Sequence, residues 1–357
     1  MKSKEKFRVL TLDGGGMRGL YSTTLLLTLA QRFDKSSNTI SLDLGKSFDL
    51  ICGTSTGAIL ATAIAAGISL ETIQNLYINE GKSIFTNPIP ASIKKYWWYL
   101  THLKRPSGNQ NKLKEALTKE FNNETLGSLY KRRNIGLCVS SIDANNFRPR
   151  VFKTPHVKTK HRDDDYLLQN ICLASASAPI FFPLSAQVDP NNKNSKQYFV
   201  DGGLWINNPV LMGIIEALSI LDNNDCPIEV ISVGTCSKPS GDPKRVKNTM
   251  WGIVDWVNGN TLMEMTLSAQ ALGNTYMAQL LCDSLNKRNI PITVIRLEET
   301  NKAPEQYSAI GLDKSDEMAI QTMIQLAIQD ADNIHSKSLQ SHVYDPIKDI
   351  FSNLSFI

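Results

Sequence analysis

The chain lacks any apolar run long enough to cross a bilayer. Its longest apolar stretch, roughly residues 59–70, includes Thr, Gly and Ser and falls short of the about 20 apolar residues that a transmembrane helix needs. The amino terminus is charged and leads directly into an expected strand, which is not the pattern of a secretory signal peptide. Both absences predict a cytoplasmic protein whose contact with a membrane is peripheral.

The cysteines lack the spacings of disulfide or metal-binding frameworks. None of the six forms a CxxC pair, and most lie in apolar stretches: Cys52, Cys138, Cys172, Cys226, Cys236 and Cys282. Such cysteines are expected to be buried free thiols in a reducing compartment. We therefore expect no metal site and no cofactor.

The chain also has little net charge. Its 357 residues carry 38 basic and 34 acidic side chains, a formal charge of +4, which is too small to indicate a nucleic-acid polymer as partner. This balance is compatible with a weakly basic face that meets anionic lipid or a phosphate-bearing ligand. The length and ordinary composition predict one large domain, or one domain with an appendage.

The hydrophobic pattern alternates between strand and helix. Strands are expected at 7–12, 48–52, 135–142, 151–153, 198–200, 228–233 and 292–297, and helices at 21–33, 58–66, 209–221 and 317–328. This alternation predicts an α/β sandwich with a mostly parallel central sheet. We expect a catalytic core over residues 7–220, and a continuation of the sheet with a helical carboxyl-terminal part over 221–357, the composition changing near 238–244.

A glycine-rich loop follows the first expected strand. Gly14, Gly15, Gly16 and Gly19 enclose Arg18 and match the dinucleotide-binding spacing G-x-G-x-x-G. Asp13 directly before the loop, and the lack of an acidic residue about twenty positions later, disfavour a dinucleotide. Bare N–H groups at the start of a helix can instead form an oxyanion hole. Taken alone, the loop leaves both interpretations open.

A second motif favours the oxyanion hole. Gly53-x-Ser55-x-Gly57 lies between an expected strand and a helix of small residues, which is the context of a nucleophile elbow. The glycines allow a sharp turn that exposes the Ser55 hydroxyl. A plain strand-to-helix loop is the alternative, and the strand before and the helix after the motif favour the elbow.

A third motif supplies a carboxylate. Asp201 follows the expected strand 198–200 and precedes Gly202 and Gly203, so the chain can approach Ser55 closely at this point. On its own, the segment is better interpreted as a simple Asp-Gly turn.

In this order the three motifs resemble those of the patatin-like phospholipases, whose core is similar to that of the cytosolic phospholipase A2 enzymes. Residues 173–183 and the Asn207-Asn208-Pro209 segment also resemble that family, and the resemblance covers roughly residues 7–220. It implies a Ser–Asp dyad that hydrolyses lipid acyl esters without a metal. Ser55 would be the nucleophile and Asp201 the base, with an oxyanion hole around Gly14, Gly15, Gly16 and Arg18.

The histidines agree with a dyad. The chain has only five, and none lies in a turn that resembles a triad member: His102, His156, His161, His335 and His342. Because a carboxylate with a pKa near 4 is a weak base for a hydroxyl, burial would have to raise the pKa of Asp201.

Residues 94–100 combine two lysines with four aromatic residues, and Lys104 and Arg105 follow. Aromatic rings beside basic groups suit a membrane interface. The alternative is a packed cluster or a dimer interface, and the pattern leaves the two open.

The chain further resembles a bacterial branch of patatin-like effectors of anti-phage defence that cyclic dinucleotides activate. The similarities are its overall length, the DGGGxRG and GTSTG forms of its first two motifs, and a helical carboxyl-terminal portion without a transmembrane segment. This resemblance implies two partners, membrane phospholipid and a cyclic dinucleotide such as cyclic GMP-AMP. A homodimer is compatible with the sequence, which leaves the oligomeric state open. Arg132, Arg133, Lys244 and Arg245 are candidate nucleotide ligands, with solvated surface charge as the alternative. A constitutive lipase, a nucleotide-binding oxidoreductase and a catalytically silent binding protein are the competing functions.

Overall fold

The computed structural model describes residues 5–33, 42–90, 94–157, 161–221, 226–237, 261–297 and 299–356. The expected composition break near 238–244 lies outside these ranges. Within them, no helix combines the length and the apolar character that crossing a membrane requires.

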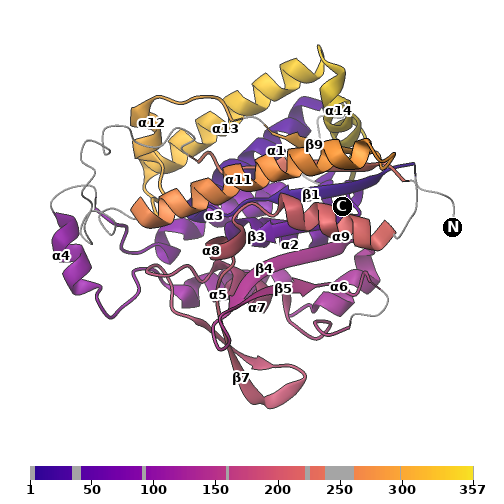
Figure 1. The fold of residues 1–357 in the computed structure, drawn as a ribbon. Helices are drawn as coiled ribbons and strands as arrows, with labels where there is room; N and C mark the ends of the chain where they lie inside the picture. The colour runs from indigo at the N-terminus through magenta and orange to yellow at the C-terminus, as the bar shows by residue number, and fades with distance from the viewer. Residues whose placement is uncertain are drawn as a thin grey trace.

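A central eight-stranded sheet organises the molecule (Figure 1). Its strands are β1 (Phe7–Leu12), β3 (Leu50–Thr54), β4 (Gly136–Asp143), β5 (Arg148–Lys153), β6 (Ser185–Asp189), β7 (Asn192–Asp201), β8 (Ile228–Val233) and β9 (Ile292–Arg296). The strands β4, β3, β1, β8 and β9 lie side by side in parallel, and β5, β6 and β7 add antiparallel pairs at the β4 end. The expectation of a mostly parallel α/β sheet is confirmed.

The parallel strands are hydrophobic because helices cover both of their faces. Alternate residues of β1 point to opposite sides, so that Leu10 joins the larger core and Val9 the smaller one. The larger core packs against α1, α2, α3, α5, α7 and α13, and the smaller core against α9 and α11. Figure 1 shows α11 and α9 in front of the sheet.

The helices have the following bounds. They are α1 (Gly19–Phe33), α2 (Thr56–Ala66), α3 (Leu70–Ile84), α4 (Lys94–Thr101), α5 (Gln110–Phe121), α6 (Leu126–Arg133), α7 (Leu168–Ala176), α8 (Gly203–Ile206), α9 (Val210–Leu221), α11 (Thr261–Asn286), α12 (Pro304–Ala309), α13 (Glu317–Ser338) and α14 (Asp345–Ser352). A second, two-stranded sheet pairs β2 (Leu42–Asp43) with β10 (Ser355–Phe356).

Strand β4 places the two strands that carry the candidate functional residues next to each other. One of its edges pairs with β5 over its whole second half, so β3 and β7 must share the other edge. Along that edge Thr54 pairs with Ser140, and Asp201 pairs with the next residue, Ser141. The end of β3 and the end of β7 are thus placed side by side, although about 150 residues separate them in sequence.

Candidate active site

Ser55 occupies a strained turn between β3 and α2. Its φ is 55° and its ψ is −122°, a region that serine rarely adopts and that costs about 1–3 kcal/mol. The turn is tight because a side chain on Gly53 would collide with the Gly57 carbonyl, and one on Gly57 with the Leu12 carbonyl at the end of β1. Ser55 therefore lies at the amino-terminal end of α2, as a nucleophile elbow requires.

The Ser55 hydroxyl donates a hydrogen bond to the carboxylate of Asp201. Oγ lies 2.6 Å from Oδ2, and the Gly203 N–H donates to Oδ1 at 2.6 Å. Burial raises the pKa of Asp201 to about 6, although the hydrogen bonds from Ser55 and Gly203 act to lower it. The structure thus brings together two of the residues that the sequence singled out, with a carboxyl group that is more basic than an exposed one.

The carboxyl-terminal end of α7 braces both partners, which the sequence did not reveal. The Ser175 hydroxyl, fully buried, accepts the Ser55 N–H at 2.8 Å. The carbonyl groups of Ser177 and Ser175 accept the N–H groups of Asp201 at 3.1 Å and Gly202 at 3.2 Å. One helical turn therefore holds the strained elbow and the aspartate loop in register.

Ser175→Ala is expected to lower kcat for ester hydrolysis by about 10- to 100-fold while KM stays nearly constant, because a loosened elbow misplaces the Ser55 hydroxyl. Steady-state kinetics on a soluble ester measure both constants. Ser177→Ala is the matched control, since the Ser177 hydroxyl donates to the Leu173 carbonyl and accepts from the Gln110 side chain, and neither bond involves Ser55 or Asp201. Equal losses in the two variants would show a general effect of loosening α7.

The glycine loop lies against the dyad, but its four proposed residues differ in position. Gly15 and Gly16 line the cavity beside Ser55. The Gly14 N–H donates to the Asn207 carbonyl at 3.0 Å, and Arg18 reaches back toward the Gly15 carbonyl, with 3.4 Å between Nε and the oxygen. Burial lowers the pKa of Arg18. The geometry thus favours Gly15 and Gly16 as donors over Gly14 and Arg18.

Two contacts from the carboxyl-terminal half fix the conformation of this loop. Arg296 at the end of β9 makes a bidentate ion pair with the buried Asp13, at 3.0 and 2.6 Å. Gly16 has a φ of +56°, and a side chain there would collide with the Leu312 carbonyl. Because Arg296 and Leu312 lie almost 300 residues from the loop in sequence, no local pattern could have indicated them.

Ser55 and Asp201 line an apolar cavity of about 820 Å³, its open mouth included. The lining comes from the glycine loop, the elbow, α2, α3, α5, the segment after α7, α8 and α11. It includes Ile59, Leu76, Tyr77, Ile84, Phe85, Leu113, Phe181, Phe182, Met263 and Leu267. No histidine lines it in the described part of the chain. Such a surface suits hydrocarbon chains, with the reactive groups at one side.

The aromatic cluster of α4 divides into two parts. Trp98 is buried: its indole N–H donates to the Asn87 carbonyl at 3.0 Å, and its ring stacks on His102 with centroids 4.3 Å apart. Trp97 is 73% exposed. Protein packing therefore accounts for Trp98 but not for Trp97.

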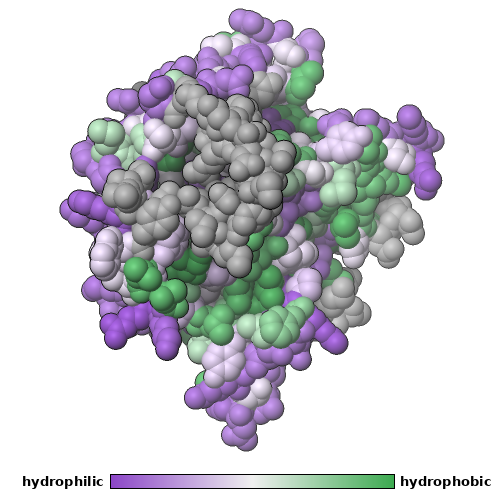
Figure 2. All heavy atoms as spheres, turned by 60° about the vertical axis from the view of Figure 1, so that its left-hand side comes forward, coloured by the Kyte–Doolittle hydropathy of each residue, from purple (hydrophilic) through white to green (hydrophobic). Residues whose placement is uncertain are grey.

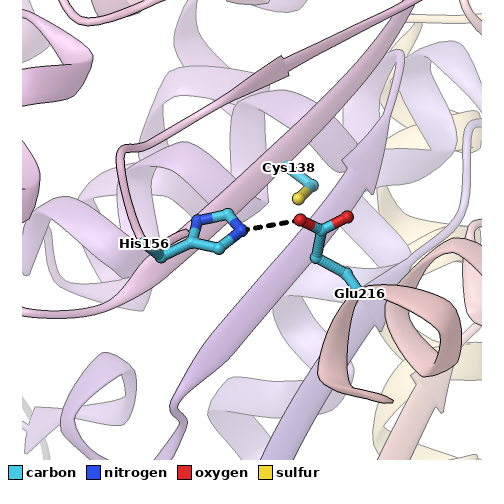
Figure 3. A group of neighbouring side chains, drawn as sticks. All are labelled: Cys138, His156 and Glu216. Carbon is cyan, nitrogen blue, oxygen red and sulfur yellow. Dashed lines mark hydrogen bonds and ion pairs between the residues drawn. The ribbon is translucent and has the colours of Figure 1, made fainter. Parts of the chain in front are cut away.

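A separate cluster lies in the smaller core, where Cys138, His156 and Glu216 bring ligand-type atoms within 4.8 Å of one another (Figure 3). Cysteine, histidine and carboxylate are zinc ligands. The three groups, however, have protein partners. His156 bonds Glu216 through Nε2 at 3.0 Å and Thr154 through Nδ1 at 2.7 Å, and Lys153 forms an ion pair with Glu216. These bonds account for the burial of the cluster and join α9 to the sheet.

Glu216→Gln is expected to reduce the free energy of unfolding by about 3 kcal/mol, because it leaves Lys153 without its buried counter-charge. Burial acts to raise the pKa of Glu216, but hydrogen bonds from His156 and Lys153 outweigh it and lower that pKa to about 2. The stabilisation is therefore present above the ordinary glutamate pKa and is lost as pH falls toward 2. Urea unfolding at pH 4.5 to 8 measures the difference, with the exposed Glu305→Gln as control; equal stability of both variants would refute this role.

The basic residues proposed as nucleotide ligands have ion-pair partners where the structure describes them. Arg133 pairs with the buried Asp43 at 2.7 Å, and Arg132 pairs with Glu124 at 2.8 Å. Lys244 and Arg245 lie outside the described residues. Arg132 and Arg133 therefore form structural ion pairs rather than a prepared phosphate site.

The chain is similar to several known proteins. A family model described as patatin-like phospholipase matches residues 10–214. A "cGAMP-activated phospholipase" of Pseudomonas aeruginosa is 32% identical over 76% of this chain and 77% of its own length. Proteins of the same name from Escherichia coli and Vibrio cholerae are 29% and 27% identical, over 74% and 87% of this chain and 73% and 86% of their own lengths. The matched segment contains the elbow, the aspartate loop and the glycine loop, and this chain belongs to the patatin-like phospholipase family of lipid hydrolases.

Proposed function

We propose that this protein is a serine acyl hydrolase that cleaves acyl esters of membrane phospholipids with a Ser55–Asp201 dyad, and that a cyclic dinucleotide activates it in antiviral defence. The observation that carries the proposal is the 2.6 Å hydrogen bond from the Ser55 hydroxyl to Asp201 at the side of an apolar cavity. In this proposal residues 7–220 form the catalytic core and 221–357 complete it, and the enzyme acts on the cytoplasmic face of the inner membrane.

In the first half of the proposed reaction, Ser55 Oγ attacks the carbonyl carbon of the acyl ester while its proton passes to Asp201. The carbonyl oxygen becomes an oxyanion, which N–H groups of Gly15 and Gly16 would stabilise with help from the amino-terminal end of α2. The tetrahedral intermediate collapses, and the leaving alcohol takes the proton from Asp201. The products are an acyl–Ser55 ester and a lysophospholipid or equivalent alcohol.

In the second half, a water molecule attacks the acyl–Ser55 carbonyl and gives its proton to Asp201. The second tetrahedral intermediate expels Ser55 Oγ, which recovers the proton from Asp201, and a fatty acid is released. The raised pKa of Asp201, about 6, supports its double role: the group is ionised at neutral pH, and it is a stronger base than an exposed carboxylate.

Activation by a cyclic dinucleotide is supported by the names of the three bacterial relatives. A control of this kind is also physically reasonable, because an ungated phospholipase would damage the membrane of its own cell. The alternative is a constitutive lipase with the same active site.

The test is the release of fatty acid from phospholipid vesicles by the purified protein, with and without a panel of cyclic dinucleotides, and with Ser55→Ala as the blank. We expect release to rise at least tenfold with one nucleotide of the panel. Equal release with and without nucleotides would support the assignment as a hydrolase and contradict activation by a cyclic dinucleotide. If no fatty acid is released from vesicles or from soluble esters under any condition, both the hydrolase activity and its activation by a nucleotide are refuted.

A further inference from the structure

The cavity mouth has an apolar rim. We define the rim as the exposed hydrophobic residues that adjoin the cavity lining: Ile180, Leu184, Leu204, Leu262 and Met265, which are between 38% and 54% exposed. Each is a lining residue or lies within two positions of one, and they come from three separate segments: the α7–β6 connection, α8 and the start of α11. Figure 2, which turns the α4 side of the molecule forward, shows hydrophobic residues gathered on this face.

Ile180, one of the rim residues, has a strained backbone conformation. Its φ is +75°, which is a genuine outlier for a β-branched residue and would be relaxed by asparagine or glycine. The strain is held in place, because the Ser107 N–H donates to the Ile180 carbonyl at 3.0 Å and the Gly108 N–H to the Phe181 carbonyl at 2.7 Å. The neighbours Pro179 and Phe181 line the cavity, while the Ile180 side chain is 43% exposed.

Charged and apolar residues continue the rim along the segment that holds Ile180 in place. Leu103 is 74% exposed, and the exposed Lys104 and Arg105 follow it, two to three positions before Ser107. In helix α4, on the same segment, Trp97 and Leu100 are 73% and 60% exposed. Apolar side chains beside cations match the two layers of an anionic membrane surface, its acyl chains and its phosphates.

We propose that the rim is a docking surface for a phospholipid bilayer and that Ile180 is inserted first, so that a lipid passes from the bilayer into the cavity without crossing water. The proposal deepens the proposed function, on which it rests for the identity of the cavity's occupant. The occupant follows from continuity and charge: the rim residues adjoin the lining of an apolar cavity, and the exposed Lys104 and Arg105 lie on the segment whose Ser107 N–H bonds the Ile180 carbonyl. It also gives a role to an exposed isoleucine at a position where the backbone favours asparagine.

The test measures binding in the inactive Ser55→Ala background, so that lipid is not consumed. Vesicles of phosphatidylethanolamine and phosphatidylglycerol are sedimented with the protein, and the bound fraction is measured against lipid concentration. Ile180→Asn combined with Leu184→Ser is expected to weaken partitioning by about tenfold or more, because two side chains no longer leave water. Ile180→Asn suits its φ, so the thermal unfolding temperature should not fall.

Leu339→Ser is the matched control. Leu339 is 63% exposed, so its replacement removes about as much apolar surface as one of the two rim substitutions. It lies in the segment between α13 and α14, and Figure 1 shows α14 on the side of the molecule away from α4. Its partitioning should equal that of the parent. Lys104→Ala combined with Arg105→Ala should weaken binding to vesicles with phosphatidylglycerol and leave binding to phosphatidylcholine vesicles unchanged.

Unchanged partitioning of the rim variant, or an equal loss with Leu339→Ser, would overturn the proposal. A rim variant that converts a dimer to a monomer without lipid, as light scattering would show, would assign the rim to contact between copies instead. The proposed function is judged separately, by the hydrolysis of a water-soluble short-chain ester by the wild type. Failure there with every cyclic dinucleotide of the panel, as well as without one, refutes the hydrolase, whereas failure of vesicle binding refutes only the docking surface.

Discussion

Ser55→Ala is expected to lower kcat for ester hydrolysis by about 10⁴-fold or more, since it removes the group that forms the acyl–enzyme bond. The fold should remain intact, because an alanine at this position keeps the backbone N–H that the Ser175 hydroxyl accepts. Fatty acid release from vesicles and turnover of a soluble ester both measure the effect, and circular dichroism and thermal unfolding check the fold.

Ser336→Ala is a suitable control for this variant, because Ser336 is exposed on α13, far along the chain from the elbow. It should keep wild-type activity. If Ser55→Ala retained more than a few per cent of the wild-type rate, the nucleophile would have to be another residue.

Asp201→Asn is expected to reduce kcat by about 10⁴-fold, because an amide cannot accept the Ser55 proton at neutral pH. The kcat/KM of the wild type should also depend on pH. With a pKa of about 6 in the folded protein, the base is protonated below that value, so kcat/KM rises with pH through about 6 and is level above it. The pH–rate profile on a soluble ester measures this dependence.

The same substitution has an opposite effect on stability. A carboxyl group whose pKa is raised in the folded state from 3.8 to about 6 binds its proton more tightly there, so the folded state loses stability as pH rises between these values. The cost above pH 6 is about 3 kcal/mol. Asp201→Asn should therefore unfold at a higher temperature than the wild type at pH 7. A lower unfolding temperature together with retained activity would contradict the role of Asp201 as a buried base.

Much of the fold could be predicted from sequence because its signals are local. The strands at 7–12, 228–233 and 292–297 were expected from short apolar runs, and they form β1, β8 and β9 with bounds that differ by at most one residue. The elbow was recognisable because Gly53 and Gly57 are needed within two residues of Ser55. A turn whose requirements lie within five residues leaves a readable pattern.

Other parts were not predictable, each for a physical reason. Helix α11 was missed because its apolar residues are spread around the helix, with Leu272 and Tyr276 exposed. The hairpin of β6 and β7 was expected only at 198–200, because most of the remainder of β7 is exposed and polar. Ser175 and Arg296 act through single hydrogen bonds and ion pairs across more than 100 residues, which one sequence cannot reveal.

The central claim is that Ser55 is a nucleophile that Asp201 activates. The most direct measurement is covalent trapping with a fluorophosphonate, followed by the mass of the intact protein and by peptide mapping. The account predicts a single adduct on Ser55 in the wild type, with a rate of formation that falls at least 100-fold in Asp201→Asn. An adduct on a different serine, or equally fast labelling of Ser55 in both proteins, would contradict it.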